Sequence, residues 1–288
     1  RQGTHGTRQQ PERAAMTPSV VPPPAQRPLV FITGASSGIG QALALRYAQL
    51  GWRLALVARR GDLVRAWLQE QRLDTAGCAV YTADVRDADS VVAAATRCQV
   101  ELGLPQVVIA NAGISIGIDT AQREDLDVLA DLMATNLLGL AATFHPFIRP
   151  MRVARRGTLV AVSSVAAIRG LPGHAGYCAS KSAVVAYAES LRNELTVDGI
   201  RVVTLLPGFI DTPLTRGNPY PMPFLMPAQD FAAQAVQAIS HGATLRVIPW
   251  QMAWVARLLR LLPDPWFDRL IAGRGRKPRR PRPAAPLD

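Results

Sequence analysis

Seven short apolar runs rich in β-forming residues recur along this chain, and helical stretches separate most of them. Each run is continuously apolar rather than alternating, which is typical of strands buried on both faces. Strands that alternate with helices predict one α/β domain: a doubly wound parallel sheet of the Rossmann type, with about seven strands and helices on both faces. The runs are residues 29–33, 53–58, 79–84, 106–111, 157–164, 201–208 and 245–250.

Composition divides the rest of the chain. Hydrophobic residues make up 49% of the 288 residues and charged residues 18%, so the chain can bury a full core. We expect a Pro-rich disordered segment over residues 1–27, the α/β domain over 28–250, an amphipathic helical extension over 251–272 and a basic disordered tail over 273–288. Residues 1–27 lack the apolar run of a signal peptide or a membrane span.

The net charge of +11 is mainly terminal, since six basic residues fall within 274–282. A basic face for specific nucleic-acid binding is therefore not indicated. The three cysteines have no paired spacing and the four histidines no metal-ligand spacing. We expect no disulfide and no metal site, and a cytoplasmic protein.

The segment "TGASSGIG", residues 33–40, joins the first expected strand to a helix. Gly34, Gly38 and Gly40 permit a tight turn, and the helix N-terminus beyond them offers N–H groups to a phosphate. The same letters contain Gly34-x-Ser36-x-Gly38, the pattern of a serine-hydrolase nucleophile elbow. That alternative is disfavoured, because several strands precede such an elbow and no HGGG-like oxyanion segment is present.

Arg59 follows the second expected strand, where an acidic residue would bind the ribose 2′-hydroxyl of NAD. A guanidinium at this position suits a 2′-phosphate, and Arg60 stands next to it. The sequence thus favours NADP(H) over NAD(H). The other interpretation is a solvated arginine pair at the end of a strand.

The stretch "YCASK" places Tyr177 and Lys181 four residues apart on one face of an expected helix. A nearby cation favours the phenolate and lowers the pKa of a tyrosine toward the range useful for proton transfer. The chain contains 32 lysines and arginines, and only Lys181 and Lys277 are lysines. The alternative is a surface tyrosine stacked on the aliphatic stem of a lysine.

Polar or turn residues follow four expected strands on the edge where parallel strands end. They are the glycine-rich turn at 33–40, Asn111 in "NAG", Ser164 in "SS", and Pro207–Gly208 with Thr212 after that turn. Asn136 lies in an expected helix, although asparagine is a poor helix former.

Together these motifs resemble the classical short-chain dehydrogenase/reductase family across roughly residues 29–250. The matching features are TGxxxGxG at 33–40, Asp84, NAG at 111–113, Asn136, Ser164, YxxxK at 177–181 and PG at 207–208. The resemblance implies a hydride transfer between NADP(H) and a carbonyl or alcohol substrate. The alternative of another class is a dinucleotide-binding sensor or interaction protein on the same fold, which need not keep a proton relay.

The resemblance also implies residue roles. Tyr177 would be the proton donor and acceptor, Lys181 would lower its pKa and bind the nicotinamide ribose, Ser164 would orient the substrate oxygen, and Asn136 would hold a water. The implied cofactor-binding residues are Gly34, Ser36, Ser37, Gly38, Ile39, Gly40, Arg59, Asp84, Val85, Asn111, Ala112, Gly113, Tyr177, Lys181, Pro207, Gly208 and Thr212.

The segment 209–232 is Pro-rich and apolar, and in the family this region closes over the substrate. Beside Ser164, we expect Met222, Phe224, Leu225 and Met226 to contact an apolar substrate, although they equally suit packing of the lid on the body. His174 is interpreted as a loop histidine rather than a substrate contact.

The family resemblance implies a homodimer or homotetramer through residues 121–145 and 177–198. The extension after Trp250 carries Trp, Leu and Arg at helical spacing. It suits peripheral contact with the inner face of a membrane, or packing on the body or on a partner.

Overall fold

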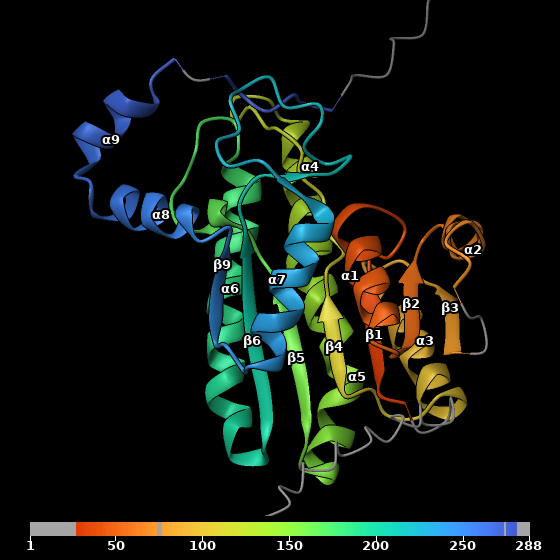
Figure 1. The fold of residues 1–288 in the computed structure, drawn as a ribbon. Helices are drawn as coiled ribbons and strands as arrows, with labels where there is room; N and C mark the ends of the chain where they lie inside the picture. Colours follow the sequence, from red (N-terminus) through yellow and green to blue (C-terminus); the bar gives the residue numbers. More distant parts are fainter. Residues whose placement is uncertain (1–26, 74–76, 274, 281–288) are drawn as a thin grey trace, which may run out of the picture.

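The computed structural model describes residues 27–73, 77–273 and 275–280. Apart from Arg27, the Pro-rich segment expected to be disordered lies outside the described residues. The predicted fold is confirmed: a seven-stranded parallel sheet has the order β3-β2-β1-β4-β5-β6-β9 (Figure 1). The strands are β1 Leu29–Thr33, β2 Arg53–Ala58, β3 Cys78–Thr82, β4 Val107–Ala110, β5 Gly157–Val162, β6 Ile200–Pro207 and β9 Leu245–Ile248.

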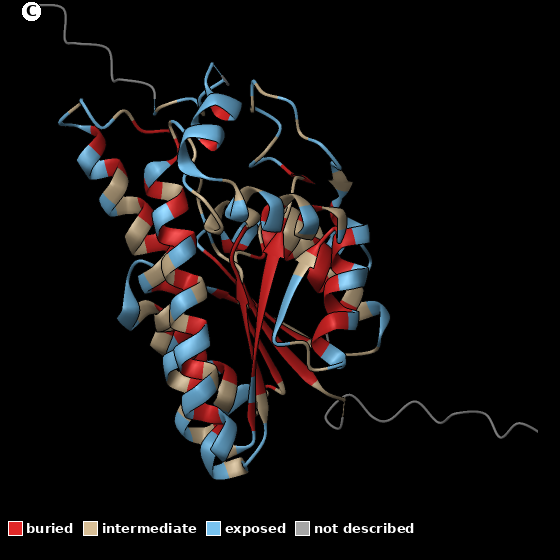
Figure 2. Cartoon of the chain, turned by 90° about the vertical axis from the view of Figure 1, so that its left-hand side faces the viewer, coloured by how far each residue is buried: buried red, intermediate tan, exposed pale blue. Residues whose placement is uncertain are grey.

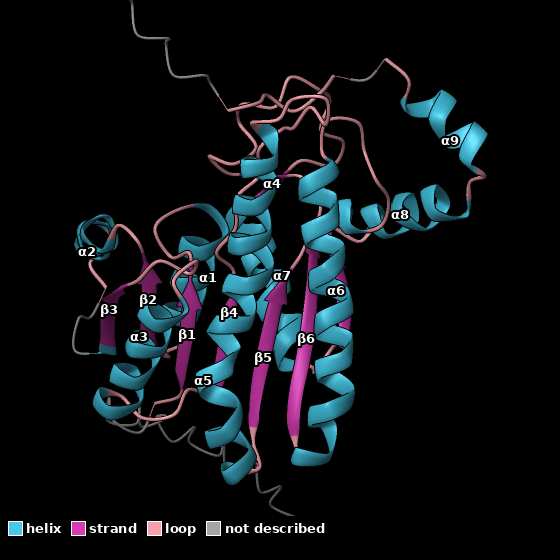
Figure 3. Ribbon diagram, turned by 180° about the vertical axis from the view of Figure 1, so that it is seen from behind, coloured by secondary structure: helices cyan, strands magenta, loops and turns pink. Residues whose placement is uncertain are grey.

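Helices cover both faces of the sheet because successive strand residues point to opposite sides. Val30 and Ile32 pack with α1 (Gly38–Gln49), α2 (Gly61–Glu70) and α7 (Ala228–Ser240). Leu29 and Phe31 pack with α3 (Ala88–Glu101), α5 (Gly139–Ala154) and α6 (Ala175–Leu195), the face seen in Figure 3. Figure 2 shows the strands buried almost throughout between these two layers.

One helical stretch among the described residues, Asp125–Ala154, is long and apolar enough to cross a membrane. It comprises α4 (Asp125–Met133), the π-helical turn η3 (Ala134–Leu138) and α5. Phe144, Phe147 and Met151 of this stretch are fully buried in the core beside the sheet. Its apolar face is therefore used inside the fold.

The site edge carries short additional elements that the sequence did not predict. There a 3-10 turn, η4 (Val165–Ala167), follows β5. Another 3-10 turn, η5 (Thr196–Asp198), lies at the opposite edge, between α6 and the start of β6. Beyond β6, the two-residue strands β7 (Ile210–Asp211) and β8 (Met226–Pro227) pair with each other. The pairing of β7 with β8 holds together the two ends of the loop between them, residues 212–225, which forms the lid segment.

The C-terminal extension forms two helices, α8 (Gln251–Leu261) and α9 (Asp264–Ile271). From there the chain crosses back over the site edge, as Figure 1 shows at the top of the molecule. The expectation of disorder from residue 273 does not fit residues 275–280, because they are bonded to the body. Arg279 Nε lies 2.7 Å from the buried Asp125, Arg280 Nη2 lies 2.7 Å from Asp131, and Gly117 N donates to the Pro278 carbonyl at 2.9 Å. Acidic side chains on α4 thus hold the basic tail; residues 281–288 lie outside the described part.

Candidate active site

The glycine-rich turn between β1 and α1 approaches the strand end of β4 closely. Gly34 has φ +72°, and a Cβ there would lie 2.7 Å from the Ala112 Cα; Gly38 has φ +56°, and a Cβ there would lie 3.1 Å from the Thr212 Cβ. Both positions need glycine for conformation and for space. Ser37 caps α1 in an extended conformation, so the first N–H groups of the helix face the groove beside the turn.

This groove has a volume of about 350 Å³. Most of the predicted cofactor residues line it, namely Ser37, Gly38, Ile39, Asn111, Ala112, Gly113, Tyr177, Lys181, Pro207, Gly208 and Thr212. Gly34, Ser36, Gly40, Arg59, Asp84 and Val85 do not line it. Of these, Gly34 and Gly40 shape the turn, and Val85 is buried against Gly139.

Asn111 has a second task that its sequence motif did not indicate. Its Nδ2 donates to the Thr33 carbonyl at 3.1 Å, and its backbone N donates to Thr33 Oγ1 at 3.2 Å. The NAG segment is thereby tied to the start of the glycine-rich turn, which holds the two walls of the groove at a set distance.

Arg59 and Asp84 follow neighbouring strands, β2 and β3, beyond the glycine-rich turn. Asp84 is engaged by Arg86, whose Nη2 lies 2.8 Å from its carboxylate; the hydrogen bond from Arg86 and, more weakly, the charge of Arg59 lower the pKa of Asp84. Arg59 is exposed and makes no ion pair with a carboxylate in the described part of the chain. Its guanidinium is therefore available to a ligand.

Tyr177 and Lys181 lie one turn apart on α6, as predicted. Lys181 is buried, and its Nζ donates to the Val162 carbonyl at the end of β5, 2.9 Å away. Ser163 Oγ donates to the Lys181 carbonyl at 2.8 Å. Both the side chain and the backbone of Lys181 are therefore hydrogen-bonded to residues at the end of β5. Burial lowers the pKa of Lys181 to about 8.

The expected lowering of the tyrosine pKa is not what this structure shows. Burial raises the pKa of Tyr177, a hydrogen bond with Ser164 opposes that rise, and Lys181 is not among the groups that shift it. Ser164 Oγ also accepts from Ala166 N at 3.2 Å, which fixes the serine at the start of η4. The hydroxyls of Ser164 and Tyr177 thus meet at the floor of the groove.

Asn136 lies in the π-helical turn η3, where the helix makes room for its amide. Its Oδ1 accepts from Ile114 N at 2.9 Å, and its Nδ2 donates to the Ile114 carbonyl at 3.0 Å and to Ser180 Oγ at 2.9 Å. A Cβ on Gly113 would lie 3.2 Å from Asn136 Oδ1 and 3.4 Å from Lys181 Nζ. The water site stays a prediction, and the amide and the amine both lie close to this glycine.

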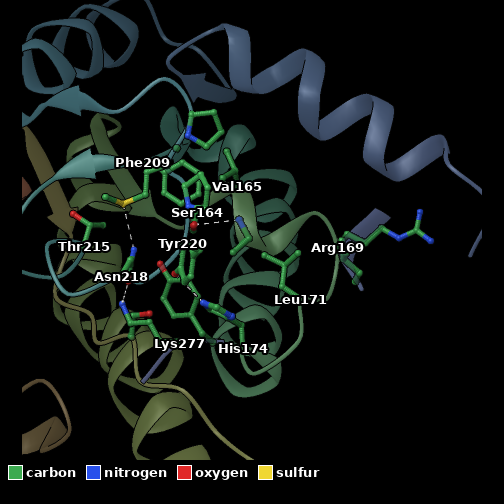
Figure 4. Close-up of a pocket in the computed structure, with 18 of the residues that line it drawn as sticks. Ser164, Val165, Arg169, Leu171, His174, Phe209, Thr215, Asn218, Tyr220 and Lys277 are labelled. Atoms are coloured by element: carbon green, nitrogen blue, oxygen red, sulfur yellow. Dashed lines mark hydrogen bonds between the residues drawn. The ribbon is translucent and has the colours of Figure 1, made fainter. Parts of the chain in front are cut away.

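A second cavity, of about 800 Å³, is drawn in Figure 4. It shares Ser164 and Tyr177 with the groove. Of the four apolar residues predicted to line it, only Met222 does so. Phe224 and Leu225 are about half exposed, and Met226 pairs in β8 and packs on the core. These three residues do not line the cavity, because the β7–β8 pair turns the chain away from it after Pro223. Their contact with a substrate stays a prediction.

Much of this cavity wall was not predicted from the sequence. Phe209, Tyr220 and His174 line it, with His174 Nε2 3.1 Å from the Tyr220 hydroxyl and His174 Nδ1 3.0 Å from the Pro172 carbonyl. One face of α8 lines it too, through Met252, Val255, Ala256 and Leu259. Their i, i+3, i+4, i+7 spacing was the available signal for this face. No group of three or more His, Cys, Asp or Glu side chains that could hold a metal ion occurs among the described residues.

The fold, the groove and the Ser–Tyr–Lys arrangement define a nicotinamide-dinucleotide oxidoreductase. The chain belongs to the short-chain dehydrogenase family, whose model matches residues 28–220. It is 38% identical over 238 residues to an uncharacterized oxidoreductase of Myxococcus xanthus (strain DK1622), covering 83% of this chain and 94% of the relative.

Two further similarities agree with this assignment. The chain is 35% identical over 187 residues to a sulfoacetaldehyde reductase of Chromohalobacter salexigens, covering 65% of this chain and 74% of the relative. The crystal structure of levodione reductase superposes with a TM-score of 0.69 at 26% identity, covering 78% of this chain and 98% of that one. The protein therefore binds NAD or NADP, and neither the hydrolase nor the sensor alternative gains support.

Proposed function

We propose that this protein is an NADP(H)-dependent carbonyl reductase or alcohol dehydrogenase for an apolar substrate. The observation that carries the proposal is the meeting of the dinucleotide groove and the larger apolar cavity at Ser164 and Tyr177. A substrate oxygen placed there lies beside both hydroxyls. When bound, the cofactor supplies or accepts the hydride.

The protein's own residues handle the proton and the geometry. In the reductive direction the Tyr177 hydroxyl donates its proton to the substrate oxygen, while Ser164 hydrogen-bonds the same oxygen and orients it. One N–H of Lys181 is used by the Val162 carbonyl. Its other donors can reach a ribose hydroxyl. The bonds of Asn136 to Ile114 keep the strand end in place.

Two observations support a reductase rather than a sensor. All four residues of the implied relay are present, and two of the similar proteins are named as reductases. The test is a panel of carbonyl and alcohol substrates monitored by NADPH and NADH absorbance. Turnover of at least one apolar aldehyde or ketone is expected, whereas turnover of none would favour the sensor.

Cofactor preference is proposed to depend on Arg59. The variant Arg59→Ser is expected to raise the KM for NADPH by roughly tenfold to a hundredfold, because a charge-assisted bond to the 2′-phosphate is lost. The KM for NADH should stay within a few-fold. The matched control is Arg65→Ser on α2, where the guanidinium lies 2.8 Å from Asp62 and away from the groove. Equal use of both cofactors by the unchanged protein would refute the role.

A second candidate function, peripheral membrane contact, is favoured by the outer face of the extension. Trp250, Trp254, Leu258 and Leu261 are 63–82% exposed and lie opposite the helix face that lines the cavity. Trp266 and Leu270 of α9 are exposed as well, and Arg257, Arg260 and Arg269 accompany them. Tryptophan and leucine beside arginine suit the interface of an anionic bilayer.

Vesicle sedimentation tests this contact. We expect binding to anionic vesicles and loss of binding in Trp250→Glu/Trp254→Glu. Val153→Glu, at an equally exposed valine on α5, is the control. Vesicle-independent dimerisation of the protein that the double variant abolishes would instead assign this face to a second copy. The homodimer or homotetramer through the α4–α5 and α6 helices stays a prediction.

A further inference from the structure

Each of the two lysines of this arginine-rich chain lines one of the two cavities of the site. Lys181 lines the dinucleotide groove, and Lys277 lines the larger cavity. Lys277 belongs to the tail segment that crosses the site edge. Its Nζ donates to the Leu214 carbonyl at 3.0 Å and to Asn218 Oδ1 at 2.7 Å, both in the lid segment (Figure 4).

The larger cavity has an unbalanced charge. Its described lining contains two cations, Arg169 and Lys277, and no aspartate or glutamate. Arg169 is occupied, because it donates to the Leu259 and Leu262 carbonyls and pairs with Asp264. Among the described residues, the Lys277 ammonium is bonded to two neutral oxygens, and an ammonium has three N–H groups, so one donor is left for a ligand.

The groups around Lys277 do not compensate its charge. Burial lowers the pKa of Lys277, with no carboxylate in the described part of the chain opposing it. Burial lowers the pKa of His174 as well, and the charge of Lys277 adds to that effect. A partly buried cation without an anion is costly, and a ligand anion relieves that cost.

The position of Lys277 is held from outside the cavity. Arg279 and Arg280 pair with Asp125 and Asp131 on α4, and the Pro278 carbonyl accepts from Gly117 N. The ammonium is therefore placed before a ligand arrives, which favours affinity. It shares the cavity with His174 and Tyr220, and Tyr220 lies close enough to Tyr177 for an electrostatic interaction.

We infer that Lys277 binds an anionic group of the substrate. The substrate class is an apolar carbonyl or alcohol compound that carries a carboxylate, sulfonate or phosphate. Its oxygen lies at Tyr177, its apolar part contacts the cavity wall of Val165, Leu171, Phe209, Met252 and Leu259, and its anion meets the Lys277 ammonium. This inference rests on the proposed carbonyl chemistry.

The test compares an ω-oxo carboxylic acid with the n-alkanal of the same chain length, over short to long chains. In the unchanged protein the oxo acid should have the lower KM at the best length. Lys277→Met should raise the KM of the oxo acid by roughly tenfold to a hundredfold and leave that of the alkanal within about twofold. Lys277→Arg should retain most of the preference. An equal change for both substrates would mean that Lys277 only holds the lid, and would overturn the inference.

Two further measurements separate the possible failures. Arg280→Met loosens the tail without removing the ammonium, so it should not copy the selective effect of Lys277→Met. Calorimetric binding of an unreactive alkanoate to the protein with NADP⁺ should weaken in Lys277→Met as the KM does. If no carbonyl is turned over but this binding persists and depends on Lys277, the proposed reaction fails and the anion site stands. If alkanals are turned over but no carboxylate preference exists, only the anion site fails.

Discussion

Tyr177→Phe is expected to lower kcat by roughly a hundredfold to ten-thousandfold, because it removes the proton donor and leaves the ring in place. Tyr177 packs against the small apolar cluster of Ile118, Val128 and Leu132, and phenylalanine keeps these contacts. The lost hydroxyl also ends the hydrogen bond with Ser164. Steady-state reduction of the best aldehyde of the panel measures the effect.

Binding of NADPH, followed by its fluorescence, is the control for this variant and should change by only a few-fold. A parallel Tyr220→Phe variant removes a second cavity hydroxyl that bonds His174 and is not placed at the groove. It should have a much smaller effect on kcat. A Tyr177→Phe enzyme within a few-fold of the original would contradict the proton-transfer role.

Lys181→Arg is expected to keep a positive charge and still lose roughly a hundredfold or more in kcat/KM. The buried ammonium donates to the Val162 carbonyl at 2.9 Å beside Gly113, and the longer, planar guanidinium of an arginine does not reproduce that position and bond. An arginine there must displace the strand end or leave the site. The measurement is kcat/KM for NADPH-dependent reduction, accompanied by the thermal midpoint of unfolding to confirm that the variant is folded.

Lys277→Arg is the matched conservative change, because it alters the other lysine of the same chain at a less buried position. It should retain most of the activity on alkanals. If Lys181→Arg had nearly the original activity, the result would contradict a chemical role for the Lys181 ammonium in the "YCASK" motif.

The local sequence was sufficient to predict the parallel sheet and the residues of the dinucleotide groove. Strands such as Leu29–Thr33 are apolar on both faces because helices cover both faces of the sheet. A strand of this kind is recognised from its run of consecutive apolar residues. Gly34 and Gly38 were predictable because positive φ and close backbone approach leave little other choice of residue. Tyr177 and Lys181 were predictable because helical spacing places them on one face.

The electrostatics of the same residues were not predictable in this way. The pKa of Tyr177 is raised by burial, and the Lys181 ammonium is bonded to a strand carbonyl. The position of Asn136 in the π-helical turn likewise depends on its hydrogen bond with Ile114, which is 22 residues away in the chain.

By itself, the sequence determined the doubly wound oxidoreductase fold, the glycine-rich turn and the Tyr–Lys pair on one helix face. Each of these features is encoded by residues that are close together in the chain. Only the tertiary structure decided what surrounds the substrate. The β7–β8 pair removes Phe224, Leu225 and Met226 from the cavity, while α8 and the tail bring Met252, Leu259 and Lys277 into it. These walls come from segments far apart in sequence, and charge pairs such as Arg279–Asp125 bring them together.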